Sequence, residues 1–223
     1  MFASLRVLLV GGEALTPAII RDLVSRNNRP KHILNGYGPT ESTTFTTTYE
    51  CGEFGDSVPI GRPINTRKVL VLDENRQLVP VGMTGELYIG GAGLARGYLN
   101  QPELTEEKFV SNPYATEEEK AKGQAVLYRT GDLVRYLADG NIEYLGRNDD
   151  QVKIRGFRIE LGEIETALMH IDGVKQVVVN AIEREGSKSL AAYIVPQDEG
   201  MLDNVEFNAL LSEQLPEFML PSS

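Results

Sequence analysis

The sequence predicts an α/β plus α+β protein, in which a parallel sheet with helices leads into a β-rich region and then into a small second unit. Three observations carry this prediction. A continuous apolar stretch at residues 6–10 is followed by a glycine break and a helical pattern. From residue 57 the apolar runs are short and alternate with polar turns, as in antiparallel strands. From residue 150 the patterns run strand, helix, strand, strand, helix.

The first region reads as strand, helix and strand. Arg6–Val10 is uniformly apolar after its first residue, which favours a strand buried in a parallel sheet. Thr16-Pro17 supplies an N-cap and a proline at the first helical position, and the helix should end before Asn27–Pro30. His32–Leu34 then predicts a second short strand.

The β-rich region shows three short apolar segments, at Val69–Leu72, Leu78–Val81 and Glu86–Ile89, which we interpret as strands. A helix is expected over Leu104–Phe109, and Thr116–Glu119 has the spacing of a capping box.

A hairpin is predicted around Asp139-Gly140, between strands at Val134–Ala138 and Asn141–Leu145. Asp-Gly between strand residues favours a two-residue turn in which both positions have positive φ.

A polar run at Arg147–Asp150 marks a domain boundary, so we divide the chain into residues 1–148 and 149–223. The second unit is expected to contain the following elements: a strand over Val152–Ile159 interrupted at Gly156, a helix over Gly162–Ile171, a strand over Val174–Ile182, a turn at Glu185-Gly186, a strand over Leu190–Val195 and a helix over Val205–Leu215.

Composition narrows the function classes. The net charge is −10, and residues 150–223 contribute −7 of it, from 6 Lys/Arg and 13 Asp/Glu. Such an acidic chain without a basic cluster disfavours nucleic-acid binding. The sequence has neither the long apolar run of a membrane helix nor an evident signal peptide, so we expect a soluble cytoplasmic protein. With one cysteine (Cys51) and two histidines (His32, His170), the chain has no internal disulfide, no Cys/His zinc site and no recognisable hydrolase triad.

The glycine-rich segment Gly90–Gly93 follows a strand but lacks the fingerprint of either common phosphate-binding loop. We therefore interpret it as a tight turn or bulge.

A stronger candidate site is the loop Asn35–Glu41, which follows the second strand. Ligands of open α/β sheets bind at such strand ends. Tyr37 offers a ring face, Asn35 an amide, Thr40 a hydroxyl for phosphate and Glu41 a carboxylate for Mg²⁺. A plain polar turn accounts for these residues equally well.

Asp132, within Tyr128–Leu133, is a carboxylate at a strand end beside a glycine. A carboxylate in this position suits two ribose hydroxyls, although an aspartate that stabilises a turn is equally common.

Five motifs occur in order along the chain and together resemble the adenylation domains of nonribosomal peptide synthetases, within the adenylate-forming (AMP-binding) superfamily. They are Asn35–Glu41, Gly85–Leu99, Tyr128–Leu133, Gly146–Glu165 and Leu215–Pro221. The resemblance covers essentially the whole chain. It implies the C-terminal portion of the large subdomain, including a β-barrel-like part, followed by a small α+β subdomain that is truncated at its end.

The resemblance also implies site residues. Asn35 and Tyr37 would hold and stack on adenine, in a loop with Gly36 and Gly38. The remaining implied roles are Thr40 at the phosphate, Glu41 on Mg²⁺, Asp132 on the ribose hydroxyls, Tyr144 beside the nucleotide and Arg147 near ribose and phosphate. The candidate catalytic residues are therefore Thr40, Glu41 and Arg147. Asp149 matches the family's hinge.

The implied reaction joins an amino acid to ATP as aminoacyl-AMP, and then transfers it to the phosphopantetheine of a peptidyl carrier domain. A condensation domain is an expected neighbour. The selectivity positions that match are Leu9, Gly11, Gly36, Thr44 and Phe45. This uncharged set resembles pockets for branched aliphatic amino acids, valine most of all.

The sequence departs from the family pattern in lacking the phosphate loop, the upstream aspartate that pairs with the substrate amine, and the catalytic lysine of the small subdomain. We therefore expect these residues alone to be inactive and to expose sheet surface. Three alternatives stay open: a D-alanyl carrier ligase, an acyl-CoA synthetase, and a non-catalytic remnant that binds a nucleotide or a partner.

Overall fold

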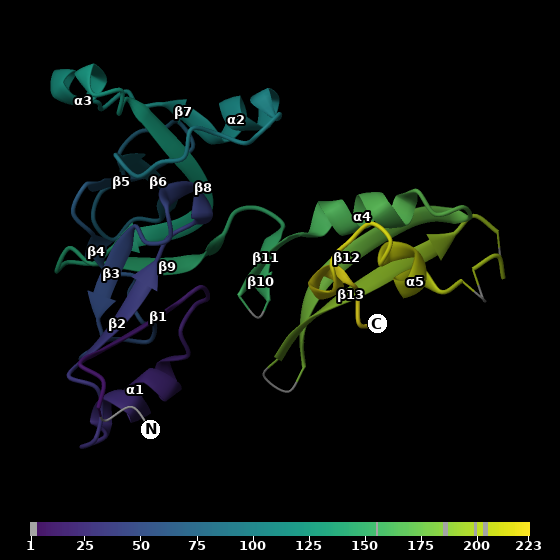
Figure 1. Cartoon of the computed structure of the whole chain (residues 1–223), viewed down its shortest axis with the longest axis horizontal. Coiled ribbons are helices and arrows are strands. Elements are labelled where there is room, and N and C mark those ends of the chain that lie inside the picture. The colour runs from purple at the N-terminus through teal and green to yellow at the C-terminus, as the bar shows by residue number, and fades with distance from the viewer. Residues whose placement is uncertain (1–3, 155, 185–186, 199, 203–204) are drawn as a thin grey trace. The chain divides into compact units, whose positions relative to one another are not determined.

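The structure is a computed structural model that describes residues 4–154, 156–184, 187–198, 200–202 and 205–223. The chain is organised as two compact units, residues 1–148 and 149–223, which are described separately (Figure 1). Among the described residues, none of the helices is long and apolar enough to cross a bilayer.

The first sheet of unit 1 has the strand order β1-β2-β3-β4. Its members are β1 (Val7–Gly11), β2 (His32–Tyr37), β3 (Thr47–Glu50) and β4 (Arg62–Pro63). β1 and β2 are parallel, with Leu9 opposite Leu34 and Gly11 opposite Gly36, and the other pairs are antiparallel. The helix α1 (Pro17–Ser25) connects β1 to β2 and has Pro17 in its first turn, as predicted.

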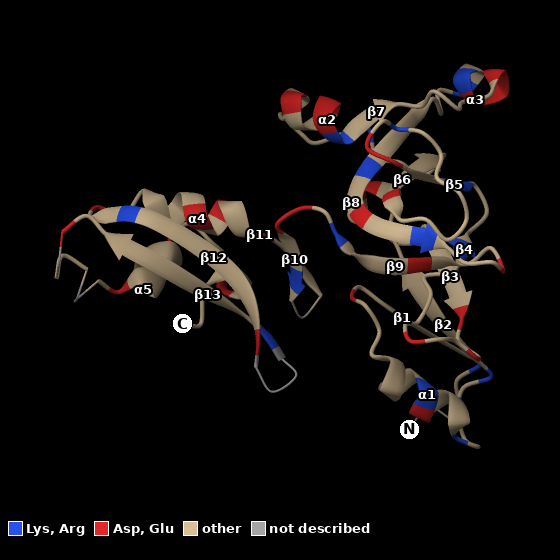
Figure 2. Ribbon diagram, turned by 180° about the vertical axis from the view of Figure 1, so that it is seen from behind, with Lys and Arg blue, Asp and Glu red and all other residues tan. Residues whose placement is uncertain are grey.

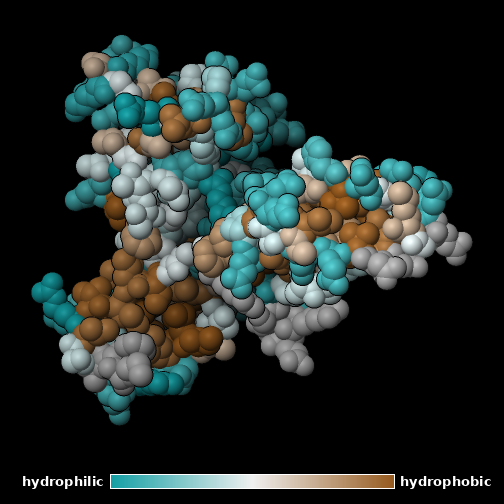
Figure 3. Space-filling view, turned by 45° about the vertical axis from the view of Figure 1, so that its right-hand side comes forward, coloured by the Kyte–Doolittle hydropathy of each residue, from teal (hydrophilic) through white to brown (hydrophobic). Residues whose placement is uncertain are grey.

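Only one face of this sheet is covered by α1. Ile33 of β2 is fully buried and packs with Ile20 of α1. On β1, Val7 and Leu9 are 41% and 43% exposed, and Leu5 before it is 41% exposed. Figure 3 shows a broad apolar surface over the N-terminal part of the chain. The prediction of a buried first strand is therefore wrong. β1 is an edge strand with β2 as its neighbour in the described part of the chain, and the expected exposed sheet surface is present.

The second sheet of unit 1 has five antiparallel strands. They are β5 (Arg67–Leu72), β6 (Gly85–Gly91), β7 (Phe109–Ser111), β8 (Val126–Tyr136) and β9 (Ile142–Arg147). The long β8 pairs with β6, and it also pairs with β7 near its start and with β9 near its end. The core of this sheet includes Val71, Leu87, Ile89, Tyr128 and Ile142.

Two predicted features of this region need correction. Leu78–Val81 forms no regular strand, and its one isolated bridge joins Leu78 to Leu72. The Asp73 carboxylate accepts the N–H groups of Asn75 and Gln77, which stabilises a turn immediately before this segment.

The Asp139-Gly140 hairpin exists, but Gly140 alone of the two has positive φ (82°). The Gly140 N–H donates to the Leu137 carbonyl, and the Asp139 carboxylate accepts the Asn141 N–H at 2.9 Å. The hairpin loop is therefore longer than the predicted two-residue turn, and it ends in one left-handed residue, Gly140.

The two short helices of unit 1 are α2 (Pro102–Lys108) and α3 (Glu117–Ala121). The predicted capping box is confirmed, because Thr116 Oγ1 accepts the Glu119 N–H at 3.2 Å and Glu119 Oε2 accepts the Thr116 N–H at 2.7 Å. Three glutamates lie in the first turn of α3, where the helix dipole favours negative charge (Figure 2).

Unit 2 is a small α+β module. Its elements are β10 (Gln151–Ile154), β11 (Phe157–Glu160), α4 (Leu161–Met169), β12 (Val174–Arg184), β13 (Ser187–Pro196), α5 (Phe207–Leu211) and the 3₁₀ turn η2 (Glu217–Met219). β10–β11 and β12–β13 are antiparallel pairs, and Ile159, Ile164, Leu168 and Leu211 form the core. The predicted helix over Val205–Leu215 is shorter than expected, because only hydrogen-bonded turns continue beyond Leu211 before Pro216. The predicted turn Glu185-Gly186 lies outside the described residues.

Candidate functional site

A buried polar cluster links the last residues of β2 and β9 to the middle of β8. The Tyr37 hydroxyl donates to Asp132 Oδ2, and Arg147 Nη1 donates to Asp132 Oδ1 at 2.6 Å. Arg147 Nη2 also donates to the Thr130 carbonyl at 3.0 Å. Residues far apart in the sequence thereby meet at one carboxylate. Charge-assisted hydrogen bonds of this kind fix side-chain geometry strongly.

An irregularity in β8 places Asp132 in this cluster. Arg129 pairs with Tyr88 and Leu133 pairs with Glu86, so that Thr130–Asp132 lie opposite Leu87 alone. Gly131 has φ of 76°, a conformation that favours glycine. A bulge of this type turns a side chain to a new direction, which explains why the polar motif interrupts an apolar strand.

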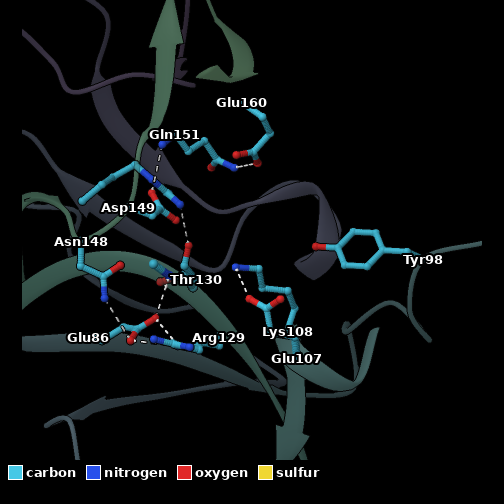
Figure 4. Close-up of polar contacts among 12 residues, drawn as sticks. Glu86, Tyr98, Glu107, Lys108, Arg129, Thr130, Asn148, Asp149, Gln151 and Glu160 are labelled. Atoms are coloured by element: carbon cyan, nitrogen blue, oxygen red, sulfur yellow. Dashed lines mark hydrogen bonds and ion pairs between the residues drawn. The ribbon is translucent and has the colours of Figure 1, made fainter. Parts of the chain in front are cut away.

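Glu86 supports the bulge from β6. Its carboxylate accepts Arg129 Nε at 3.1 Å, the Gly131 N–H at 3.0 Å and Asn148 Nδ2 at 3.2 Å (Figure 4). Glu86 is not among the site residues predicted from the sequence. The available signal is a glutamate inside the apolar strand run Glu86–Ile89, since a half-buried strand seldom keeps a carboxylate without partners.

Burial raises the pKa of Tyr37 well above its ordinary value, and the neighbouring Asp132 charge raises this pKa further. Tyr37 is 8% exposed. Its hydroxyl is therefore a fixed hydrogen-bond donor at neutral pH.

The other predicted residues of the Asn35–Glu41 motif lie partly in β2 and partly in the loop after it, because β2 extends to Tyr37 and not only to Leu34 as predicted. Asn35 is buried, and its amide donates to the Pro59 carbonyl at 2.8 Å. Gly38 is needed for close packing, because a Cβ there would lie 2.5 Å from the Thr44 carbonyl. Thr40 opens the 3₁₀ turn η1 (Thr40–Ser42) and is exposed, so its hydroxyl faces solvent.

Glu41 is 7% exposed, and its carboxylate accepts the Tyr98 hydroxyl at 2.6 Å. No group of three or more His, Cys, Asp or Glu side chains with metal-binding spacing occurs among the residues that the structure describes. A single carboxylate still suits Mg²⁺, which keeps several waters and binds one or two carboxylates together with substrate phosphates. Glu41 therefore fits the predicted metal role as a lone protein ligand.

Four of the five predicted pocket residues lie together. A Cβ on Gly36 would lie 2.6 Å from the Phe45 ring and 3.1 Å from the Leu9 side chain, and one on Gly11 would lie 3.3 Å from the same ring. The glycines therefore let the Phe45 ring approach the strands β1 and β2. Thr44 is exposed with φ of 70°, and it follows Thr43, which is also left-handed.

Tyr144 and Asp149 occupy different surroundings. Tyr144 of β9 is half-buried and packs against the core of the second sheet. Asp149 is the first residue of unit 2, where its carboxylate accepts the Gln151 N–H at 3.3 Å.

Comparison with known proteins decides the family. Residues 1–99 match the family described as AMP-binding enzyme. The chain is 52% identical over 224 residues to tyrocidine synthase 3 of Brevibacillus parabrevis, and 50% identical over 224 residues to gramicidin S synthase 2 of Brevibacillus brevis. Each of these alignments covers 100% of this chain. Residues 1–99 belong to the AMP-binding enzyme family.

Two solved structures are similar to this chain in fold. The structure of PA1221, described as a nonribosomal peptide synthetase (NRPS) protein containing adenylation and PCP domains, matches with a TM-score of 0.82 and 35% identity, over 97% of this chain and 42% of that chain. A four-domain nonribosomal peptide synthetase bound to AMP and glycine matches with a TM-score of 0.56 and 39% identity, over 96% of this chain and 15% of that chain.

Two predictions about this AMP-binding chain are thereby confirmed: its identification with nonribosomal peptide synthetase adenylation domains, and its α/β plus α+β fold class. The chain spans 3% and 5% of the lengths of the two curated relatives, which are much longer synthetases.

Proposed function

We propose that this chain is part of an enzyme that activates an amino acid with ATP and loads it onto a carrier domain. The first step forms aminoacyl-AMP and pyrophosphate, and the second forms a thioester with phosphopantetheine. The observation that carries the proposal is the buried cluster of Tyr37, Asp132 and Arg147 beside the Glu41 loop, in a chain of the AMP-binding family.

In this proposal the nucleotide binds along the Asn35–Glu41 loop, with adenine against Asn35 and Tyr37 and with Tyr144 beside it. The ribose hydroxyls donate to Asp132. Tyr37 and Arg147 each donate to a different oxygen of this carboxylate, which fixes its orientation.

The proposed reaction is an in-line attack of the substrate carboxylate on the α-phosphate, with pyrophosphate as the leaving group. The exposed Thr40 hydroxyl would donate to a phosphate oxygen, and the Arg147 guanidinium would offset the charge that develops on the phosphoryl group. Glu41 would hold Mg²⁺. When bound, that ion neutralises phosphate charge. Most of the rate enhancement then comes from positioning and charge neutralisation.

The substrate that the pocket favours is a branched aliphatic amino acid, valine most of all. Leu9 and Phe45 present apolar surface, and Gly11 and Gly36 add no side chain of their own beside the Phe45 ring. None of these side chains is charged, so a charged amino acid would bury its charge without a partner at a cost of several kcal/mol.

The proposed partners are a peptidyl carrier domain and a neighbouring condensation domain. The solved PA1221 protein is described as containing adenylation and PCP domains, which supports the first of these. We also propose that Asp149 is the hinge at which unit 2 turns between the two half-reactions, since the division between the two compact units falls there.

Hydroxamate trapping tests this proposal on the full-length protein. Hydroxylamine intercepts an acyl-adenylate, and the hydroxamate is then identified by mass spectrometry. We expect valine hydroxamate as the main product from a mixture of amino and fatty acids. Mainly D-alanine or fatty-acid hydroxamate would instead support a D-alanyl carrier ligase or an acyl-CoA synthetase. A charged or aromatic product would refute the valine assignment.

We expect the 223 residues alone to be inactive, because the sequence lacks the phosphate loop and the catalytic lysine of the family pattern. Titration calorimetry of this chain with AMP separates an incomplete enzyme from a non-catalytic remnant. Binding that Asp132→Ala abolishes supports the first, whereas no binding at millimolar AMP supports the second.

A further inference from the structure

The segment Gly91–Tyr98, which we call the strap, is tied to the loop that carries Glu41. The Thr43 hydroxyl donates to the Gly93 carbonyl at 2.8 Å, and the Ala95 N–H donates to the Glu41 carbonyl at 2.8 Å. The third contact is the Tyr98 hydroxyl on the Glu41 carboxylate at 2.6 Å. The glycine-rich start of the strap thus supports a neighbouring loop through its backbone.

Two further contacts hold Tyr98 itself. Its N–H donates to Thr105 Oγ1 at 2.9 Å, and its ring meets Phe109 edge to face, with centroids 5.7 Å apart. Phe109 in turn packs against Tyr128 of β8 at 5.2 Å. Gly97 allows the close approach to α2, since a Cβ there would lie 2.4 Å from the Thr105 side chain. The position of the Tyr98 hydroxyl is therefore set by α2, β7 and β8.

We propose that Tyr98 is a positioning residue that holds the Glu41 carboxylate in one orientation for a divalent cation. The inference rests on the proposed role of Glu41 as the metal ligand. A glutamate has three side-chain torsions, and the hydrogen bond to Tyr98 selects one arrangement of the Glu41 carboxylate. Hydrogen-bonding partners of metal ligands typically change metal affinity by roughly 10- to 100-fold.

The test is Tyr98→Phe in the full-length protein, which removes the hydroxyl and keeps the ring against Phe109. Binding of Mn²⁺ is measured by electron paramagnetic resonance in the presence of a non-hydrolysable ATP analogue. We expect the Mn²⁺ dissociation constant to rise by about tenfold or more, while the affinity for AMP without metal stays unchanged. The matched control is Tyr49→Phe, whose hydroxyl donates to the Glu53 carbonyl at 2.9 Å, and it should bind Mn²⁺ like the wild type.

A double-mutant cycle with Glu41→Gln separates the metal role of Glu41 from the positioning role of Tyr98. We expect E41Q to weaken Mn²⁺ binding and Y98F to add nothing in the E41Q background. Should E41Q weaken Mn²⁺ binding and Y98F leave it unchanged, only the positioning role is overturned. Unchanged binding in E41Q itself overturns both the metal role of Glu41 and this inference. A further loss from Y98F in the E41Q background shows that Tyr98 acts elsewhere, and it also overturns the inference. All binding is measured below the melting temperature of each variant.

Discussion

Asp132 and Arg147 form a buried ion pair, with Asp132 Oδ1 at 2.6 Å from Arg147 Nη1 and side chains 5% and 10% exposed. An ion pair of this kind is costly to break, because the remaining charge stays buried without its partner. The same carboxylate accepts the Tyr37 hydroxyl. Asp132 therefore fixes the positions of Arg147 and Tyr37, and it is also the residue at which we propose that the ribose binds.

The first prediction concerns this pair. Asp132→Ala leaves the Arg147 guanidinium buried without its partner and should lower the free energy of unfolding by roughly 3–5 kcal/mol. Urea denaturation of the 223-residue chain, followed by circular dichroism, measures the change. Asp56→Asn, at an exposed aspartate, is the control and should stay within about 0.5 kcal/mol of the wild type. A loss below about 1 kcal/mol for D132A would show that the pair is open to solvent.

The second prediction concerns pH. Because the pKa of Tyr37 is raised in the folded state, the unfolded chain ionises this tyrosine first, near pH 10. The stabilisation is fully present below pH 10 and is lost as the pH rises towards the folded pKa.

Tyr37→Phe removes this titration, so the stability difference between wild type and variant should shrink by about 1.4 kcal/mol from pH 9 to pH 11. Denaturant titrations at both pH values measure it. Tyr49, Tyr88, Tyr98 and Tyr136 also have raised pKa values, and they contribute equally to both proteins. A constant difference across this range would contradict the burial of the Tyr37 hydroxyl, and the exposed Tyr193→Phe serves as control.

The third prediction concerns the pocket. Gly36→Ala places a methyl group 2.6 Å from the Phe45 ring, so the ring must move or the pocket must lose volume. We expect kcat/KM of the full-length protein for valine to fall by roughly 10- to 200-fold, and to fall less for alanine. Gly55→Ala has open space around its Cβ and should leave both values unchanged. An equal loss for valine and alanine would place Gly36 outside the side-chain pocket.

The fourth prediction is a stability effect away from the site. Thr116→Ala removes the N-cap of α3 and should cost about 1 kcal/mol in the free energy of unfolding. Valine-dependent activity of the full-length protein should be unchanged, because α3 is outside the candidate site. Its Glu119 accepts a hydrogen bond from Lys68 of β5, which is also outside that site. A loss of activity without a loss of stability would indicate a role for α3 in the reaction.

Local patterns of the sequence predicted much of this structure. Thr16-Pro17 preceded a helix, Thr116 and Glu119 formed their capping box, and strands appeared in most of the apolar runs. These features depend on neighbours within a few residues, which the sequence displays directly.

Features that depend on distant partners were harder to predict. The apolar run at Val7–Val10 cannot reveal that β1 lies at a sheet edge, because edge position depends on which strands pair. Likewise, the Glu86 and Tyr98 contacts span 43 to 62 residues, and no short motif encodes them. Leu78–Val81 forms one isolated bridge and no regular strand, and its apolar run is interrupted by Pro80, which has no N–H to donate to a neighbouring strand.

The proposal that this protein forms a valyl-adenylate with its ribose at Asp132 is tested by pyrophosphate exchange into ATP. The exchange is measured with valine on the full-length wild type and on Asp132→Asn. The exchange requires formation of the aminoacyl-adenylate, and D132N removes the carboxylate at which we place the ribose and which holds Arg147. We predict valine-dependent exchange in the wild type and at least a roughly 100-fold loss in D132N, equivalent to about 2.7 kcal/mol. Exchange that is independent of valine would contradict valine activation, and exchange that is unchanged in D132N would contradict the role of Asp132.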